Sequence, residues 1–261
     1  MFNSIRPRSK IHYIELAYTL AKKDLKVRYK TASLGFVWAI LNPLLMMVVL
    51  TAIFSMFIRI KTDVPYSIFV LTGLIPWTFF NLSLSSCTNS IIDNSNLIKK
   101  VYFPREIIPI SIVFANFINF SLSIIILFLF LFLFSIKITY LLLFLPAIIV
   151  VQLTFTIGIS LLTSSLNVYY RDIRYIVEAT LLMWFYITPV FYPVTMVPER
   201  FKAYYFLNPM AGIISSYRDT LLSGKVPDIY ILAETASLSL IILFIGYCVF
   251  KKIEPVFADL I

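Results

Sequence analysis

The side chains that could carry out chemistry are few, and they stand far apart along the chain. His12 is the single histidine in 261 residues, and one histidine without a cysteine or carboxylate cluster indicates a structural role rather than a metal ligand or a member of a catalytic triad. Cys87 and Cys248 fall in separate apolar runs, as is typical of unpaired thiols. Glu178 and Glu234 are expected to start on opposite sides of a membrane, so they do not form a carboxylate pair for glycosyl transfer.

The sequence also lacks the signals of a nucleotide-binding enzyme. The phosphate-binding loop of P-loop ATPases reads G-x-x-x-x-G-K-[ST], but the only Gly-Lys pair here, Gly224-Lys225, is followed by Val226. No group of His, Cys, Asp and Glu has the spacing of a metal site. We therefore expect no catalytic residue, no metal and no cofactor in this chain, and any ATP and Mg²⁺ would be bound by another protein.

The composition indicates a membrane protein. Hydrophobic residues make up 60% of the chain and charged residues 13%, which is more apolar surface than a soluble core of this size could bury. The net charge of +9 would suggest nucleic-acid binding in a soluble protein. In a membrane protein, retention of Lys and Arg on the cytoplasmic side explains it. We therefore expect a multi-pass protein of the plasma or inner membrane without a nucleic-acid partner.

The apolar runs predict an all-α integral membrane protein of six transmembrane helices, with both termini in the cytoplasm. The expected spans are residues 31–58, 64–92, 107–136, 138–166, 176–192 and 229–250, within one transmembrane domain of residues 1–261. This arrangement puts fifteen of the 22 basic residues in cytoplasmic segments and seven outside. The reverse orientation would invert that bias.

Before the first span, residues 11–30 are basic and have a helical repeat. Ile14, Tyr18, Ala21 and Leu25 recur at helical spacing with lysines between them. This pattern favours an amphipathic helix that lies in the membrane interface. Two roles stay open for it, an anchor that only sets the topology and a helix that also contacts a partner or an anionic head group.

A short basic segment separates the second and third expected spans. Residues 94–105 contain Lys99, Lys100 and Arg105, whereas the apolar runs on either side hold no charge. Each cation would cost about 3 kcal/mol at the centre of a membrane-spanning helix, so the segment must lie outside the hydrocarbon. Short basic connectors stay on the cytoplasmic side, which fixes the orientation of the neighbouring spans.

Polar side chains inside the expected spans are candidates for lining a passage. Trp38 and Asn42 share a helix face at i, i+4, and an amide at that depth needs a protein or water partner. Glu178 stands near the start of the fifth span. Its carboxylate should face the protein interior, a water path or a basic partner such as Arg174, four residues before it.

Aromatic residues extend this candidate passage. Heptad spacing places Phe185 and Tyr192 on one side of the fifth span, and Trp77 follows Pro76 in the second. Aromatic rings pack on the C–H faces of sugars, so an aromatic-lined passage would suit a carbohydrate. Interface belts of Trp and Tyr are the alternative interpretation. The candidate lining residues are Trp38, Asn42, Trp77, Glu178, Phe185 and Tyr192.

Residues 196–222 are too charged and too rich in proline to span a membrane, yet too aromatic for a plain solvated loop. Apolar pieces of ten to fourteen residues are typical of re-entrant or interfacial helices. One such helix is expected from about Met210 to Leu222, with Gly224 as its stop signal.

Six motifs in this chain, taken together and in this order, resemble the permease subunits of ABC-2 type exporters for polysaccharides. They are K-D-L-K-V-R-Y-K-T-A-S-L-G-F-V-W-A-I-L-N-P from Lys23, G-L-I-P-W-T-F-F from Gly73, L-I-K-K-V-Y-F-P-R-E from Leu97, R-D-I-R-Y from Arg171, T-P-V-F-Y-P from Thr188 and N-P-M-A-G-I-I-S-S-Y-R from Asn208. They cover most of the chain. The likeness is greatest to O-antigen and capsule exporters, with teichoic acid exporters next.

The resemblance implies a homodimer of permeases that docks on two copies of a separate ABC ATPase subunit. It implies that residues 94–105 form a coupling helix that fits a cleft in the ATPase, with the N-terminal helix beside it. The residues assigned to coupling are Asn94, Leu97, Lys99, Lys100, Val101, Tyr102, Phe103, Pro104 and Arg105. The implied cargo is a lipid-linked polysaccharide, and we expect its pyrophosphate to be attracted to Arg28 and Lys30 at the inner membrane face.

Two other classes of function stay open. A drug or small-lipid exporter of the same superfamily would share the fold but would need no aromatic lining. A membrane-embedded glycan or lipid enzyme would turn over its substrate without an ATPase, and the scarcity of histidine and paired acids argues against it.

Overall fold

The fold consists of helices throughout the residues that the structure describes. This computed structural model describes residues 10–29, 37–137 and 139–260, and no strand occurs within these ranges. The predicted all-α fold is therefore confirmed for this part of the chain. The expectations that concern Lys30 and residues 31–36 lie outside the described residues.

Five helical segments of the described chain are long and apolar enough to cross a bilayer. They are α2 (Trp38–Thr51) with the π-helix η2 (Ala52–Phe57), α3 (Tyr66–Thr88), α6 (Ile107–Leu133), η3 (Tyr140–Phe144) with α7 (Leu145–Tyr169), and α11 (Ile229–Ile253) with η6 (Glu254–Val256) and α12 (Phe257–Leu260). A helix rises about 1.5 Å per residue, so such segments match a hydrocarbon core of roughly 30 Å. The chain is a multi-pass membrane protein.

The fifth span expected from the sequence corresponds to a shorter helix, α8 (Ile173–Ile187), of 15 residues. It ends where it does because Pro189 disfavours helical geometry at the residue before it, and Thr188 is extended. The prediction that heptad spacing places Tyr192 on the same helix side as Phe185 is therefore wrong, since Tyr192 lies beyond the end of the helix.

Helix α3 lies at the centre of the bundle. In its span 78% of the residues are buried inside the chain, against 17% for the span formed by α2 and η2. The main apolar core packs around α3 from α6, α7 and α10 and includes Phe80, Phe120, Phe155 and Ile213. Helix α2 instead leaves about half of its apolar side chains exposed, namely Trp38, Leu45, Met46, Val48 and Val49.

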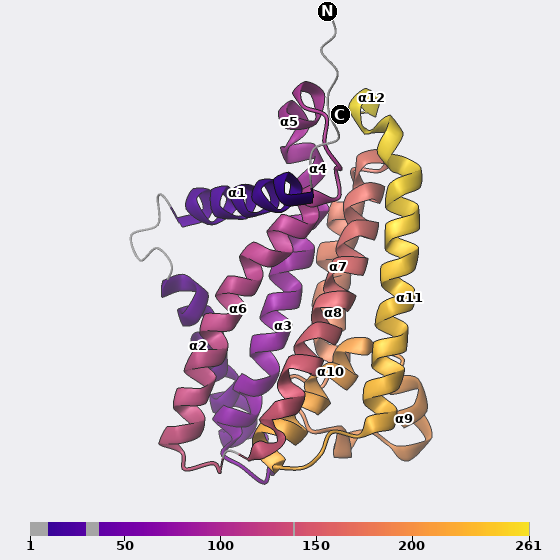
Figure 1. The fold of residues 1–261 in the computed structure, drawn as a ribbon. Helices are drawn as coiled ribbons and strands as arrows, with labels where there is room; N and C mark the ends of the chain where they lie inside the picture. The colour runs from indigo at the N-terminus through magenta and orange to yellow at the C-terminus, as the bar shows by residue number, and fades with distance from the viewer. Residues whose placement is uncertain (1–9, 30–36, 138, 261) are drawn as a thin grey trace, which may run out of the picture.

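Helices α7 and α11 form the closest helix pair in the fold and run side by side in Figure 1. A Cβ added at Gly246 would stand 2.1 Å from the main-chain oxygen of Gly158, and a Cβ at Gly158 would stand 2.6 Å from the backbone of Leu243. Small residues let membrane helices approach backbone to backbone. The two glycines therefore make α7 and α11 a tightly packed unit.

Helix α1 (Lys10–Tyr29) lies across one end of the bundle, roughly perpendicular to the long helices (Figure 1). Its inward face is formed by Leu16, Ala17, Leu20 and Ala21, which are buried or half-buried. Tyr18 is 67% exposed on the protein, so its expected place on the membrane-facing side of α1 stays a prediction. The same end of the bundle carries α4 (Ser90–Asp93), α5 (Ser95–Lys100) and α12.

The opposite end is built from short helices between α8 and α11 (Figure 1). They are η4 (Val194–Met196), α9 (Glu199–Tyr205), α10 (Pro209–Arg218) and the π-helix η5 (Asp219–Ser223). The helix expected from about Met210 to Leu222 is confirmed as α10 followed by η5. Gly224 ends it with φ of +56°, the left-handed geometry that favours glycine at a helix stop.

Candidate functional site

A groove runs between α2, α3 and α8. It encloses about 330 Å³, and its lining residues are Asn42, Pro43, Met46, Leu74, Trp77, Thr78, Asn81, Leu82, Leu181, Leu182, Phe185 and Tyr186. The rings of Trp77 and Phe185 meet with centroids 5.5 Å apart. Amides from Asn42 and Asn81 lie among these rings. A surface of aromatic faces and amide groups can pack on a sugar ring and hydrogen-bond its hydroxyls.

The groove gathers half of the candidate lining residues from the sequence. Asn42, Trp77 and Phe185 line it, although they come from three different helices. Trp38 is exposed on the same helix as Asn42, one turn earlier, but does not line the groove. Tyr192 lies beyond α8, where its hydroxyl donates a hydrogen bond to the main-chain oxygen of Ile187 at 2.8 Å.

Glu178 has the basic partner that its spacing predicted. Its Oε1 accepts a hydrogen bond from Nε of Arg174 at 3.1 Å, and both side chains are about half exposed. The main-chain N–H of Arg174 donates to Asn167 of α7, and Asn167 in turn donates to Asn89. The start of α8 is thereby fixed to the ends of α7 and α3.

The far end of α8 is fixed to α10. Asn208 caps α10 by accepting from the N–H of Met210, and the same Oδ1 accepts from Trp184 Nε1 at 2.8 Å. The amide nitrogen of Asn208 donates to the hydroxyl of Thr188 at 3.0 Å. A single side chain thus joins the start of one helix to the end of the other.

Arg218, at the end of α10, holds the chain that follows α8. Its Nη2 donates to the main-chain oxygen of Val190 at 2.7 Å and to that of Phe69 at 3.3 Å, and its Nη1 lies 3.5 Å from that of Tyr192. The guanidinium stands 3.6 Å from the centroid of the Phe69 ring. Gly73 makes room for this contact, since a Cβ there would stand 2.9 Å from Nη2.

A buried polar chain connects three helices behind the groove. The hydroxyl of Tyr217 donates to Oε1 of Gln152 at 2.8 Å, and Nε2 of Gln152 donates to the main-chain oxygen of Pro76 at 2.9 Å. Both side chains are almost fully buried, and each polar group has a partner, as burial requires. The chain ties α10 to α7 and to α3 next to Trp77.

A second, more polar cavity of about 650 Å³ lies at the end of the bundle that carries α9 and α10. Its charged lining residues are Lys61, Asp63, Arg218, Asp219, Lys225 and Asp228. The cations and carboxylates balance in number, so the cavity has no excess charge. Burial raises the pKa of the Asp219 carboxyl, and Lys225 lowers it in part.

At the opposite end, the basic segment forms α5 and an extended stretch that follows it. Tyr102 is 91% exposed, and Lys99, Lys100 and Val101 are also exposed. Asn94 begins α5, and its side chain donates to the main-chain oxygen of Ser90 and lies 3.4 Å from Nζ of Lys23 in α1. This contact places the α1 helix beside the basic segment.

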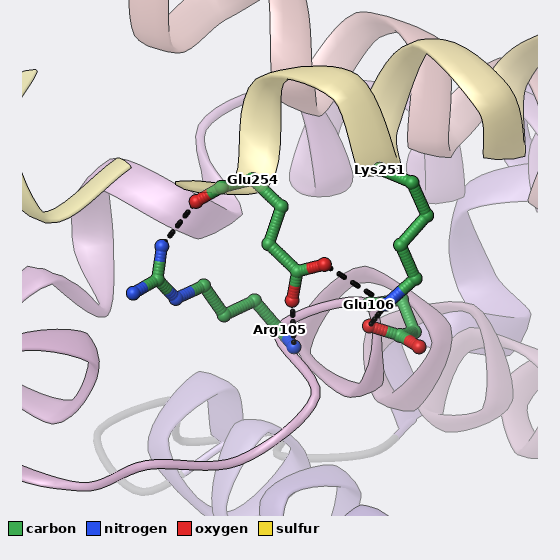
Figure 2. Close-up of polar contacts among 4 residues, drawn as sticks. All are labelled: Arg105, Glu106, Lys251 and Glu254. Carbon is green, nitrogen blue, oxygen red and sulfur yellow. Dashed lines mark hydrogen bonds and ion pairs between the residues drawn. The ribbon is translucent and has the colours of Figure 1, made fainter. Parts of the chain in front are cut away.

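The remainder of the basic segment is held inside the chain. Leu97 and Pro104 are half-buried and Phe103 is only 5% exposed. Arg105 donates to Glu254 twice, from its main-chain N–H to Oε1 at 3.0 Å and from Nη1 to the main-chain oxygen (Figure 2). The continuous stretch that a partner protein could reach without rearrangement is therefore Lys99 to Tyr102, and Asn96 is exposed one turn before it.

The structure adds site residues that the sequence analysis did not single out. Arg218, Gln152 and Glu254 each make contacts between distant parts of the chain. A basic residue closing a ten-residue apolar helix was the available signal for Arg218, and a glutamine inside an uncharged span was the signal for Gln152. Nothing local in the sequence indicated the partner of Glu254.

The predicted head-group residues receive no structural description. Arg28 belongs to α1, but its side chain is not among those described, and Lys30 lies outside the described residues. Within the described part of the chain, His, Cys, Asp and Glu residues form no group of three that could hold a metal ion.

Comparison with known proteins bears on the whole arrangement. The family model for the ABC-2 type transporter matches residues 15–222. The chain belongs to the ABC-2 type transporter family. The matched residues of this ABC-2 chain include both the groove and the buried Arg218 contact, whereas all of α11 and α12 lie beyond them.

Relatives of this ABC-2 chain cover almost its full length. It is 34% identical over 260 residues, 99% of this chain and 100% of the relative, to a protein named O-antigen export system permease protein RfbA from Klebsiella pneumoniae. It is 31% identical to a protein of the same name from Myxococcus xanthus, with 97% of each chain covered. It is 23% identical to the polysialic acid transport protein KpsM of Escherichia coli, over 89% of this chain and 91% of the relative.

Proposed function

We propose that this chain is the membrane-spanning permease subunit of an ATP-driven exporter that moves a lipid-linked, O-antigen-like polysaccharide out of the cytoplasm across the plasma or inner membrane. The observation that carries the proposal is the near full-length similarity to relatives named for O-antigen export. The groove supports it, because its rings and amides match the chemistry of a sugar.

In the proposed complex, two copies of the permease associate with two copies of a separate ABC ATPase, which binds ATP and Mg²⁺. The exposed stretch Lys99–Tyr102 at the tip of the basic segment would form the contact with the ATPase. Helix α1 would lie in the membrane interface beside it, as its orientation across the bundle suggests (Figure 1).

The proposed topology has both termini in the cytoplasm. Helix α8 and the residues after it would act as a sixth, shortened crossing, and α9 and α10 would be re-entrant from the outer side. The bias of basic residues toward the end that carries α1 and α5 supports this orientation. A cysteine replacing Tyr102 should react with an impermeant thiol reagent only after the membrane is opened, and reaction in intact cells would contradict the topology.

The function is tested by deleting the permease gene and complementing it with the wild-type chain. We expect the deletion to remove surface polysaccharide and to cause its lipid-linked precursor to accumulate inside the cell. Reconstituted permease with its ATPase should hydrolyse ATP in step with polysaccharide transport. Normal surface polysaccharide together with altered drug sensitivity would instead point to a drug or small-lipid exporter, and turnover of a glycan without ATPase would point to an enzyme.

A further inference from the structure

The inner end of α11 carries an ionic cluster that the export activity does not by itself require. Nζ of Lys251 lies 2.8 Å from Oε2 of Glu106 and 2.9 Å from Oε2 of Glu254. The carboxylates are largely buried, with 18% and 19% of their side chains exposed. Figure 2 shows Lys251 between the two acids. Glu254 directly follows α11, and Glu106 directly precedes α6.

Glu254 also holds the end of the basic segment. Oε1 of its side chain accepts from the main-chain N–H of Arg105 at 3.0 Å, while its main-chain oxygen accepts from the Arg105 guanidinium (Figure 2). The main-chain N–H and the guanidinium of Arg105 therefore both donate to Glu254, which lies 149 positions later in the sequence. Charge-assisted hydrogen bonds of this kind are stronger and more directional than neutral ones.

An apolar cluster lies directly beside these charges. Phe250, Ile253 and Phe257, from the end of α11 and from α12, are buried with Ile98 and Phe103 of the basic segment. The rings of Phe250 and Phe257 meet edge to face at 5.2 Å. We call this cluster and the four charged residues the inner junction. It excludes water from one side of the ion pairs, which strengthens them.

From the inner junction, α11 runs to the opposite end of the bundle without a break, and close contacts follow it. Gly246 meets Gly158 of α7 backbone to backbone, and Thr235, near the far end, fills the space over Gly212 of α10. Packed interiors resist compression and transmit displacement. Helix α10 in turn holds the residues after α8 through Arg218.

We propose that Glu254 and Lys251 are positioning residues that fasten the basic segment to α11, so that a displacement imposed on this segment is carried along α11 to α10 and to the far end of the groove. The inference rests on the proposed function only in naming the ATPase as the source of the displacement. Without the fastening, the segment would be attached to α11 and α12 chiefly through the apolar contacts of Ile98 and Phe103, which are less directional than the charged hydrogen bonds.

The fastening is tested with three variants in the full chain. Glu254→Ala removes the acceptor for Arg105 and the partner of Lys251, and Lys251→Met removes the cation between the two acids. Lys252→Met is the matched control for the export measurement only, since position 252 carries a label in the distance measurement. Lys252 is exposed on the same helix and forms no ion pair with any described residue. Spin labels on cysteines at positions 102 and 252, with exposed Cys248 replaced by serine, report the distance between the segment and α11 in purified permease.

We expect a narrow distance distribution in the labelled wild type and a clearly broadened one in Glu254→Ala and Lys251→Met. With the permease reconstituted with its ATPase, polysaccharide exported per ATP hydrolysed should fall about tenfold in both variants and stay unchanged in Lys252→Met. Glu254→Gln keeps the Oε1 acceptor, so its polysaccharide exported per ATP should fall less than that of Glu254→Ala. In a double-mutant cycle, Glu106→Gln combined with Lys251→Met should lower export per ATP little more than either change alone, because both changes remove the same ion pair.

An unchanged distance distribution in Glu254→Ala would overturn the fastening, as would export per ATP at the wild-type level. If Glu254→Ala fails to accumulate in the membrane, Glu254→Gln and Lys251→Met carry the same comparison. Failure of the proposed function would look different, since the wild type itself would then export no polysaccharide while the distance measurement would still report on the fastening.

Discussion

Arg218 shows how a single charged side chain can stand inside an apolar bundle. No carboxylate of the described residues forms an ion pair with it. Main-chain oxygens of Val190 and Phe69 and the face of the Phe69 ring supply the compensating negative potential. The charge therefore serves as a fixed connection between α10 and the chain after α8, next to the end of the groove.

At the same scale, the groove predicts the effect of removing one ring. Phe185→Ala deletes a lining aromatic whose ring lies 5.5 Å from that of Trp77 at an interplanar angle of 58°. If the groove contacts sugar, export should fall about five- to tenfold, because one ring–sugar contact is worth roughly 1 kcal/mol. Surface polysaccharide measured at equal permease abundance gives the answer. Phe244→Ala, on the exposed side of α11, is the control and should export normally.

Asp219 predicts a pH dependence of stability. Burial raises the pKa of its carboxyl in the folded chain above the ordinary value of about 4. As pH rises past 4 the unfolded chain loses this proton first, so the contribution of Asp219 to stability falls until the pH exceeds the folded pKa. Asp219→Asn removes this loss.

Thermal unfolding in detergent checks that expectation. The Asp219→Asn variant should unfold at a higher temperature than the wild type at pH 7, and the difference should shrink toward pH 4. A difference that grows on acidification would contradict the sign derived from burial. Asp259 is an exposed residue of α12, so Asp259→Asn is a suitable control and should change the unfolding temperature little at either pH.

On the scale of helices, the seam between α7 and α11 predicts a sharp steric effect. Gly246→Ala would place a Cβ 2.1 Å from the main-chain oxygen of Gly158, so the two helices would have to separate. Overpacking of this kind costs about 1–3 kcal/mol. The unfolding temperature in detergent should drop by several degrees, whereas Ala233→Val, on the exposed side of α11, should leave it nearly unchanged.

The sequence predicted most of the long helices because uncharged runs of this length have few alternatives in a membrane. It also predicted the Arg174–Glu178 pair and the stop at Gly224, since both depend on near neighbours. It misjudged Tyr192 because a proline ended α8 early. Local patterns do not show which distant segment a helix will meet.

For that reason the groove was only partly predicted. Asn42, Trp77 and Phe185 were chosen as polar or aromatic residues inside separate spans, and the packing of α2 and α8 against α3 brings them together. The contacts of Arg105 with Glu254 join residues that lie 149 positions apart in the sequence, so no local spacing indicates them.

On the scale of the whole molecule, the exposed apolar face of α2 predicts where a second copy would meet the first. The α2 span and the α11 span are each only 17% buried, and of the two it is α2 that places an exposed apolar side chain, Met46, at the edge of the groove. In the proposed homodimer, Met46→Cys should form a crosslink between two copies in native membranes after Cys248 is replaced by serine.

Gel mobility under non-reducing conditions measures this crosslink. A cysteine at Leu240, exposed on α11 on another part of the surface, serves as the control and should stay monomeric. Equal crosslinking at both positions would mean random collision, and a crosslink only at Leu240 would place the dimer contact on α11 instead of α2.

The inner junction draws on helices that lie far apart in the sequence. Leu16 and Leu20 of α1 pack on the same apolar cluster as Phe257 of α12. During synthesis, α1 leaves the ribosome long before α12, so the cluster stays incomplete until α12 has emerged. A partner that recognises the finished surface would thus engage chains in which α12 is in place and pass over shorter nascent ones.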